Sequence, residues 1–183
     1  MFRFQKKYQI HSELPYSISL FVALPAKSDT LSHIIQKATE LGVDSISLIK
    51  TEFTQLRHPV NLQRLQKIAI EAAEQSGRGA IPIIFDNTKI SLKNFLQKKP
   101  KNLIVALERD NSTLLRQDIL NKFINKKQSY ISVLIGPEGG FSQVEKELFQ
   151  QSAVLTFTLG KIILRMETAV ISALSIINFL LSD

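Results

Sequence analysis

Cysteine is absent from the 183 residues of this chain. Its absence excludes a disulfide framework, a cysteine-ligated zinc or iron–sulfur site and a thiol nucleophile, and it fits a reducing compartment. The three histidines, His11, His33 and His58, are scattered and form no metal-ligand pattern, so we expect no metal. The segment from Met1 to Lys7 lacks the apolar core of a signal peptide, so we expect a cytoplasmic protein.

Long apolar runs are also missing. The most apolar segment, Ala169 to Leu181, is shorter than the roughly 20 residues that a membrane span needs, so no membrane partner is expected. Within it, Ser172, Ser175 and Asn178 recur at every third position and leave only one narrow polar seam. A helix this apolar is buried in a protein core or in a subunit interface, and we favour the interface.

The remaining composition is that of an ordinary globular protein. Hydrophobic residues make up 44% and charged residues 21%, with 7 glycines and 6 prolines, which rules out a disordered or collagen-like chain. The net charge is +7, and the whole excess lies in residues 1–101, which hold 15 basic and 8 acidic side chains against 8 of each in residues 102–183. This asymmetry indicates either a surface for a polyanion, with RNA or DNA ahead of an anionic membrane, or a solubilising surface.

Short β-branched runs alternate with segments of helical period from residue 18 onwards. Strands are predicted at 18–24, 45–49, 81–85, 103–107, 131–135 and 155–159, and helices at 28–42, 62–77, 91–98, 113–124, from 142 and at 169–181. Near-continuous apolar strands between helices predict an α/β fold with a mostly parallel sheet and helices on both faces. Residues 1–14 do not fit the alternation.

The first candidate for a functional segment is the glycine-rich loop from Ile135 to Phe141. It lies between an apolar strand and a helix whose start is marked by a capping box, Ser142 to Glu145. Such a loop lets the backbone approach a ligand at the carboxyl end of a parallel strand, or it is a plain tight turn. It lacks the lysine and hydroxyl residue of a phosphate loop and the spacing of a dinucleotide loop.

The second candidate segment runs from Leu159 to Ala169 and also joins a strand to a helix. Arg165 and Glu167 stand there among apolar residues, where a charge is costly unless it is paired or used. They form either part of a functional site or a structural ion pair at a helix start. Arg78, at the end of an earlier helix, is a phosphate contact or a solvated helix terminus.

Four segments together resemble the RsmE family of ribosomal RNA methyltransferases in the SPOUT superfamily. They are Lys37-Ala-Thr-Glu-Leu-Gly-Val43, Ile68-Ala-Ile-Glu-Ala-Ala-Glu-Gln-Ser-Gly-Arg78, Ile135-Gly-Pro-Glu-Gly-Gly140 and Leu159-Gly160 with Ile163-Leu-Arg-Met-Glu-Thr168. The resemblance covers residues 15–183 and implies a SPOUT methyltransferase domain there. Residues 1–14 are then a tail or the remnant of an N-terminal PUA-like RNA-binding domain.

The resemblance implies a C-terminal trefoil knot, a homodimer through the last helix, and S-adenosylmethionine bound in the knot. The reaction it implies is methylation of N3 of a uridine in small-subunit ribosomal RNA, with the free RNA or the assembled subunit as partner. By the motif match, the cofactor-binding positions are Ile135, Gly136, Gly139, Leu159, Gly160, Ile163, Leu164 and Thr168.

Two residues in these motifs are the candidates for catalysis. Arg165 is expected to stabilise the anion that forms when uridine N3 loses its proton. Glu138 is expected either to accept that proton or to stabilise the helix start that follows it, and Glu167 to hold Arg165 or the loop. The candidate RNA contacts are Lys6, Lys7, Arg57, Arg64, Lys67, Arg78 and Lys161.

The chain departs from the family pattern at two places. Where the family tends to have Ser-Glu-Arg, the chain reads Thr51-Glu-Phe53, and where the family has Gly-Pro-Arg, it reads Gly160-Lys-Ile162. Two arginines expected near RNA are therefore replaced, although Lys161 keeps a positive charge. The alternatives that this leaves open are a non-catalytic RNA-binding or ribosome-assembly factor on the same fold, or a SPOUT enzyme acting on transfer RNA.

Overall fold

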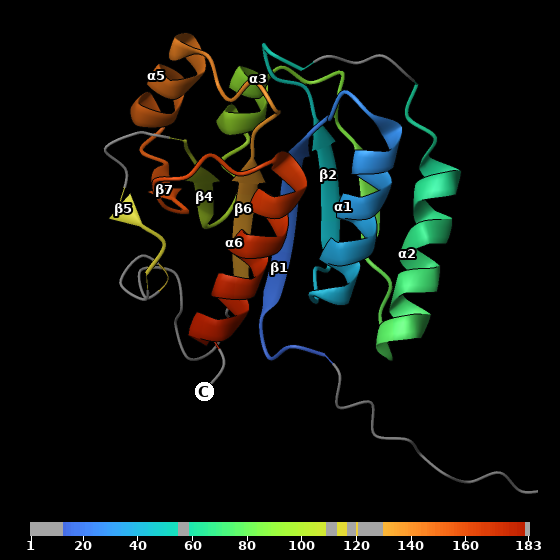
Figure 1. Ribbon diagram of the computed structural model, residues 1–183. Coiled ribbons are helices and arrows are strands. Elements are labelled where there is room, and N and C mark those ends of the chain that lie inside the picture. Colours follow the sequence, from blue (N-terminus) through green and yellow to red (C-terminus); the bar gives the residue numbers. More distant parts are fainter. Residues whose placement is uncertain (1–12, 55–58, 109–112, 117–119, 121–129, 182–183) are drawn as a thin grey trace, which may run out of the picture.

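A single parallel sheet organises the protein (Figure 1). The computed structural model describes residues 13–54, 59–108, 113–116, 120 and 130–181. The strands are β1 (Ser17–Ala23), β2 (Ser45–Ile49), β3 (Ile83–Asp86), β4 (Leu103–Ala106), β5 (Thr113–Leu114), β6 (Tyr130–Ile135) and β7 (Leu155–Thr158), in the order β3-β2-β1-β6-β4-β7-β5. All six pairings between neighbours are parallel, so the α/β fold with a parallel sheet is confirmed.

Four of the described helices connect strands: α1 (Ser28–Glu40), α2 (Leu62–Ser76), α3 (Leu92–Gln97) and α5 (Gln143–Gln151). A fifth, α6 (Met166–Leu181), follows the last strand, β7. Helices α1 and α6 lie side by side in front of the strands in Figure 1. On β1, Leu20 is fully buried, and Phe21, which points to the opposite side, contacts Phe95 of α3 with ring centroids 4.7 Å apart. Both faces of the central strands are therefore covered.

The helix ends follow the local signals in the sequence. Gly42 and Gly77 adopt φ values of +85° and +69° directly after α1 and α2, a conformation that glycine allows without strain. At the start of α5 the Ser142 hydroxyl accepts a hydrogen bond from the Glu145 N–H at 3.2 Å, and the Glu145 carboxylate accepts one from the Ser142 N–H at 3.0 Å. The predicted capping box is confirmed.

One predicted element is wrong where the structure describes it. The sequence predicts a helix over 113–124, but Thr113–Leu114 form strand β5 at the edge of the sheet, paired with β7. The Leu115 N–H donates to the Thr158 carbonyl at 3.2 Å and extends this pairing. Tertiary pairing with β7 therefore overrides the local helical period, while most of the remaining predicted helix lies outside the described residues.

Helix α6 is apolar around most of its circumference, but only one side of it is buried in the protein. Val170, Leu174 and Ile177 are fully buried, whereas Phe179 is 78% exposed. On the polar seam, the Asn178 side chain donates to the Leu41 carbonyl at 2.9 Å and accepts from the Tyr16 hydroxyl at 3.1 Å. The seam therefore anchors α6 to the end of α1. Within the described part of the chain, no helix is long and apolar enough to cross a membrane.

Candidate active site

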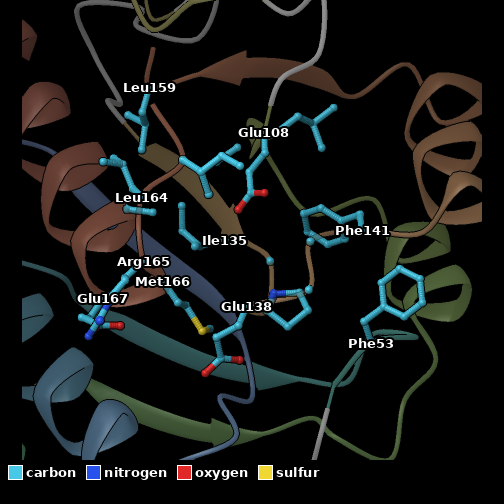
Figure 2. Close-up of a pocket in the computed structure, with 18 of the residues that line it drawn as sticks. Phe53, Glu108, Ile135, Glu138, Phe141, Leu159, Leu164, Arg165, Met166 and Glu167 are labelled. Atoms are coloured by element: carbon cyan, nitrogen blue, oxygen red, sulfur yellow. The ribbon is translucent and has the colours of Figure 1, made fainter. Parts of the chain in front are cut away.

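A cavity of about 850 Å³ opens at the carboxyl ends of the central strands (Figure 2). Its walls come from the loops that follow β6, β7 and β4, with further residues from the segments after β1 and β2. This position follows from the topology, because the carboxyl ends of parallel strands all meet at one edge of the sheet. The two loops singled out in the sequence therefore face each other across one cavity.

The first glycine loop needs its glycines because of close contacts. A Cβ atom on Gly136 would lie 2.8 Å from Cε2 of Phe141, and one on Gly139 would lie 3.1 Å from Cβ of Phe53. The backbone of the loop therefore runs directly against two aromatic side chains while it also lines the cavity. A side chain at Gly136 would displace the loop or the Phe141 ring, and one at Gly139 would require Phe53 to shift by a few tenths of an ångström. The loop also contains a tight turn, in which the Gly140 N–H donates to the Pro137 carbonyl at 2.9 Å.

Glu145 holds this loop in register with the loop after β2. Its side chain is buried, and beyond the capping box its Oε1 accepts a hydrogen bond from the Glu52 N–H at 2.8 Å. The neighbouring residue, Phe53, is thereby placed against Gly139 at the edge of the cavity. The sequence marks Glu145 only as a helix cap, whereas the structure gives it this second role.

The second loop is turned by Gly160 and Thr158. Gly160 has a φ of +126°, and the Thr158 hydroxyl accepts from the Gly160 N–H at 3.3 Å and donates to the Gly160 carbonyl at 3.1 Å. Of the eight positions predicted to bind the cofactor, Thr168 is exposed on α6 and does not line the cavity. The seven that line it are Ile135, Gly136, Gly139, Leu159, Gly160, Ile163 and Leu164.

Both candidate catalytic residues line the cavity, as does Glu167. The predicted ion pair between Arg165 and Glu167 is not formed, and among the described residues Arg165 has no ion-pair partner. Glu138 does not contribute to the cap of the following helix. Its Oε1 instead accepts a hydrogen bond from the Ala26 N–H at 3.2 Å, which joins the first loop to the segment between β1 and α1.

Sequence reasoning missed other residues of the cavity, above all Glu108 and Phe53. Glu108 directly follows the predicted strand 103–107, so its place after a strand end was a usable signal. Its significance depends on β4 lying between β6 and β7, an order that periodicity cannot give. Phe53 lies in the Thr51-Glu-Phe53 segment, where the resemblance noted in the sequence leads us to expect arginine. No group of three or more metal-ligating side chains occurs in the described ranges.

Arg78 is not available as a phosphate contact. Its side chain is only 3% exposed, and its guanidinium donates to the Thr39 and Val43 carbonyls at 3.0 and 2.8 Å and to the Glu13 carboxylate at 2.9 Å. Glu13 also accepts from the N–H groups of Gly79 and Ala80. Arg78 therefore fastens the segment before β1 to the ends of α1 and α2.

Of the other predicted RNA contacts, three are exposed cations and three lie outside the described residues. Arg64 and Lys67 are exposed on α2, where they form loose ion pairs with Asp29 at 3.8 Å and Glu71 at 3.9 Å. Lys161 is exposed on the second loop and lines the cavity. Lys6, Lys7 and Arg57 lie outside the described residues.

The Glu13 contacts predict a pH-dependent contribution to stability. The hydrogen bond from Arg78 is the main cause that lowers the pKa of the Glu13 carboxyl below its ordinary value of 4.5. A carboxyl with a lowered pKa stabilises the fold above that value and loses the contribution as the pH falls through its folded-state pKa. We expect wild type to be more stable than Glu13→Gln at neutral pH, with the difference shrinking below pH 4.5. Urea denaturation of both proteins across pH checks this, and a pH-independent difference would contradict it.

Comparison with known proteins identifies the family. The model of the RNA methyltransferase domain family matches residues 12–178. The chain belongs to this family. Curated relatives of this RNA methyltransferase domain are named ribosomal RNA small subunit methyltransferase E. The protein of Rickettsia conorii is 36% identical over 91% of this chain and 67% of its own length. The protein of Synechocystis is 35% identical over 94% of this chain and 56% of its own length.

Solved structures of RNA methyltransferases share the fold. A ribosomal RNA small subunit methyltransferase E of Neisseria gonorrhoeae, bound to S-adenosylmethionine, is 31% identical with a TM-score of 0.76 and covers 92% of this chain and 68% of its own. A methyltransferase structure from Legionella pneumophila with the same cofactor is 29% identical and also has a TM-score of 0.76. The match covers 91% of this chain and 67% of the Legionella chain. The chain spans about 56 to 67% of the length of the two curated relatives.

Proposed function

We propose that this protein is an S-adenosylmethionine-dependent methyltransferase that modifies N3 of a uridine in small-subunit ribosomal RNA. The observation that carries this proposal is the convergence of both glycine loops and Arg165 on one cavity. Membership of the RNA methyltransferase domain family and the names of the relatives support it. The cofactor in the two bacterial neighbour structures supports the choice of methyl donor.

The residues of the cavity fit this cofactor. A Cβ atom on Gly136 would collide with the Phe141 ring, and one on Gly139 would press against Cβ of Phe53, so the loop lines the cavity without side chains at these two positions. Ile135, Leu159 and Leu164 add apolar walls suited to a purine. When bound, S-adenosylmethionine supplies a methyl group already activated on a sulfonium. The contribution of these loops is then to align it for an in-line displacement.

Arg165 and Glu138 are the residues that would act on the uridine. A uridine nitrogen at N3 attacks only after it loses its proton, and the negative charge then spreads onto O2 and O4. The Arg165 guanidinium, which lines the cavity and has no ion-pair partner among the described residues, would stabilise that charge. Glu138 has one oxygen held by the Ala26 N–H, which leaves its other oxygen to accept the proton.

Exposed cations at the cavity and on α2 would position the RNA. A uridine must leave its base stack to enter a cavity of this kind, and phosphate contacts then fix the strand on either side of it. Lys161 on the second loop, with Arg64 and Lys67 on α2, are exposed and suited to this task. Lys6, Lys7 and Arg57 remain predictions from the sequence. The assembled small subunit or its RNA would be the partner.

We also propose that residues 15–183 form a SPOUT domain with a C-terminal trefoil knot. The sheet order supports this, because β7 inserts between β4 and β5, two strands that precede it in the chain. The chain then turns through the second loop, and α6 packs on α1 with its buried side. A late strand placed inside the sheet is what threading of the C-terminal segment requires.

The exposed side of α6 is the proposed dimer interface. Phe179 is 78% exposed, and leaving an aromatic side chain of this size in water on an apolar helix is unfavourable. We expect Phe179→Glu to convert a dimer into a folded monomer in size-exclusion chromatography with light scattering. Val144→Glu is the matched control, because Val144 is 62% exposed on α5. A dimer that survives Phe179→Glu, or a monomeric wild type, would refute the interface.

Methyl transfer tests the proposed function. The purified protein is incubated with tritiated S-adenosylmethionine and small subunits that lack the modification, with large subunits as the control. We expect label on small subunits alone, and nucleoside digestion should yield N3-methyluridine. Label on another nucleoside would overturn the assigned target. Binding of small subunits without any transfer would favour a non-catalytic RNA-binding protein.

A further inference from the structure

Glu108 is a charged residue of the cavity that neither the motifs nor the proposed reaction uses. It follows β4, which lies between β6 and β7, the two strands that lead into the glycine loops. The preceding residue, Leu107, donates its N–H to the Phe157 carbonyl of β7 at 2.8 Å and fixes the start of this segment. Figure 2 shows the Glu108 carboxylate pointing into the cavity between Ile135 and Phe141.

Within the part of the chain that the structure describes, the Glu108 carboxylate has no partner that explains its position. Among the described residues it takes part in no hydrogen bond or ion pair. Its Oε2 lies 3.9 Å from the place that a Cβ atom on Gly140 would occupy, so it sits over the backbone of the first loop. The other two acids of the cavity have structural surroundings: Glu138 accepts from the Ala26 N–H, and Glu167 lies in the first turn of α6, where the helix dipole favours it.

The charges around the cavity make this carboxylate significant for a cationic ligand. Four cations also line the cavity: Lys27, Lys146, Lys161 and Arg165. S-adenosylmethionine carries a positive sulfonium, a positive ammonium group and a carboxylate, and is cationic overall. Its product, S-adenosylhomocysteine, differs in having a neutral thioether in place of the sulfonium. A carboxylate close to the sulfur therefore attracts the methyl donor and not the product.

We propose that Glu108 faces the sulfonium and makes the cavity prefer S-adenosylmethionine over S-adenosylhomocysteine. The inference rests on the proposed function and adds the selection of donor over product to it. Methyl transfer removes the positive charge, so the attraction ends with the reaction and the product leaves more readily. Because that charge is dispersed in the transition state, Glu108 stabilises the bound donor more than the transition state. It therefore favours donor binding and product release and does not accelerate the transfer itself.

Equilibrium dialysis with both ligands tests the proposal. We compare wild type, the isosteric variant Glu108→Gln and the control Glu147→Gln, which removes an exposed charge on α5 outside the cavity. Glu108→Gln should weaken S-adenosylmethionine binding about tenfold, equivalent to ~1.4 kcal/mol, and S-adenosylhomocysteine binding less than threefold. Sinefungin carries a protonated amine near the position of the sulfonium. Glu108→Gln should therefore weaken sinefungin binding about as much as it weakens binding of the methyl donor. Glu147→Gln should leave all three affinities unchanged.

Equal weakening of both ligands would overturn the proposal, because it would place the carboxylate on the ribose hydroxyls or the ammonium group that they share. Unchanged affinities in Glu108→Gln would overturn it as well. In either case the proposed function stands, since wild type binds the cofactor. A folded wild type that binds neither ligand would instead remove the proposed function together with this inference.

Discussion

Replacing Arg165 with alanine is expected to lower kcat for methyl transfer about 100- to 1000-fold, with the affinity for S-adenosylmethionine changed less than threefold. The magnitude is that of removing one donor aimed at a developing oxyanion. Arg165 lines the cavity and has no ion-pair partner among the described residues, so no structural role competes with this one. Its exposure also makes a large loss of stability unexpected.

Single-turnover kinetics with saturating small subunits, combined with calorimetric binding of the cofactor, separate these effects. Arg165→Lys should recover part of kcat, because it keeps the charge but not the two-pronged geometry of the guanidinium. Lys93→Ala, which removes an exposed charge on α3 outside the cavity, is the control and should behave as wild type. Unchanged turnover in Arg165→Ala would remove this residue from the mechanism.

Gly136→Ala is expected to weaken binding of S-adenosylmethionine at least 100-fold. The new Cβ atom would lie 2.8 Å from Cε2 and 3.0 Å from Cζ of Phe141, a ring that is itself buried and packed edge-on against Phe149. The ring has little room to yield, so the loop must move, and overpacking of this kind also costs about 1–3 kcal/mol of stability.

Two further variants separate loss of the site from loss of stability. Gly77→Ala places a Cβ atom where nothing lies within 4 Å, but at a φ of +69°, so it should cost about 1–2 kcal/mol without affecting the cofactor. The double variant Gly136→Ala with Phe141→Leu removes the colliding ring edge and should regain part of the lost affinity. If Gly136→Ala bound the cofactor as tightly as wild type, the close packing of this loop would not define the site.

Much of the fold was accessible from the sequence because the signals were local. The glycines at the ends of α1 and α2 and the hydroxyl and carboxylate of the α5 capping box act within one helical turn, and each was found where predicted. Pro82, a residue type that favours the edge or the start of a strand, directly precedes β3, which is an edge strand. The prediction that failed is the helix over 113–124. This segment has a helical period, but Thr113 and Leu114 pair with a strand more than forty residues later.

The site was predicted only in part, because its loops carry local signals whereas their arrangement depends on the order of the strands in the sheet. Two loops with unusual glycines could be recognised one at a time, and the structure brings them together because β4 separates β6 from β7 in the sheet. The same strand order gives Glu108 its place between them, which no spacing in the sequence reveals. For Arg78, the local signal in the sequence was misleading. A cation beside two glycines suggested a surface role, but three elements distant in sequence bury it.

Calorimetric titration of the purified protein with S-adenosylmethionine tests the central claim most directly, with NADH and ATP as control ligands. We expect selective binding of the methyl donor at one site per subunit, with no heat from either control. If the protein is folded by circular dichroism but binds no S-adenosylmethionine, the cavity is not a cofactor site, and a non-catalytic RNA-binding function is favoured.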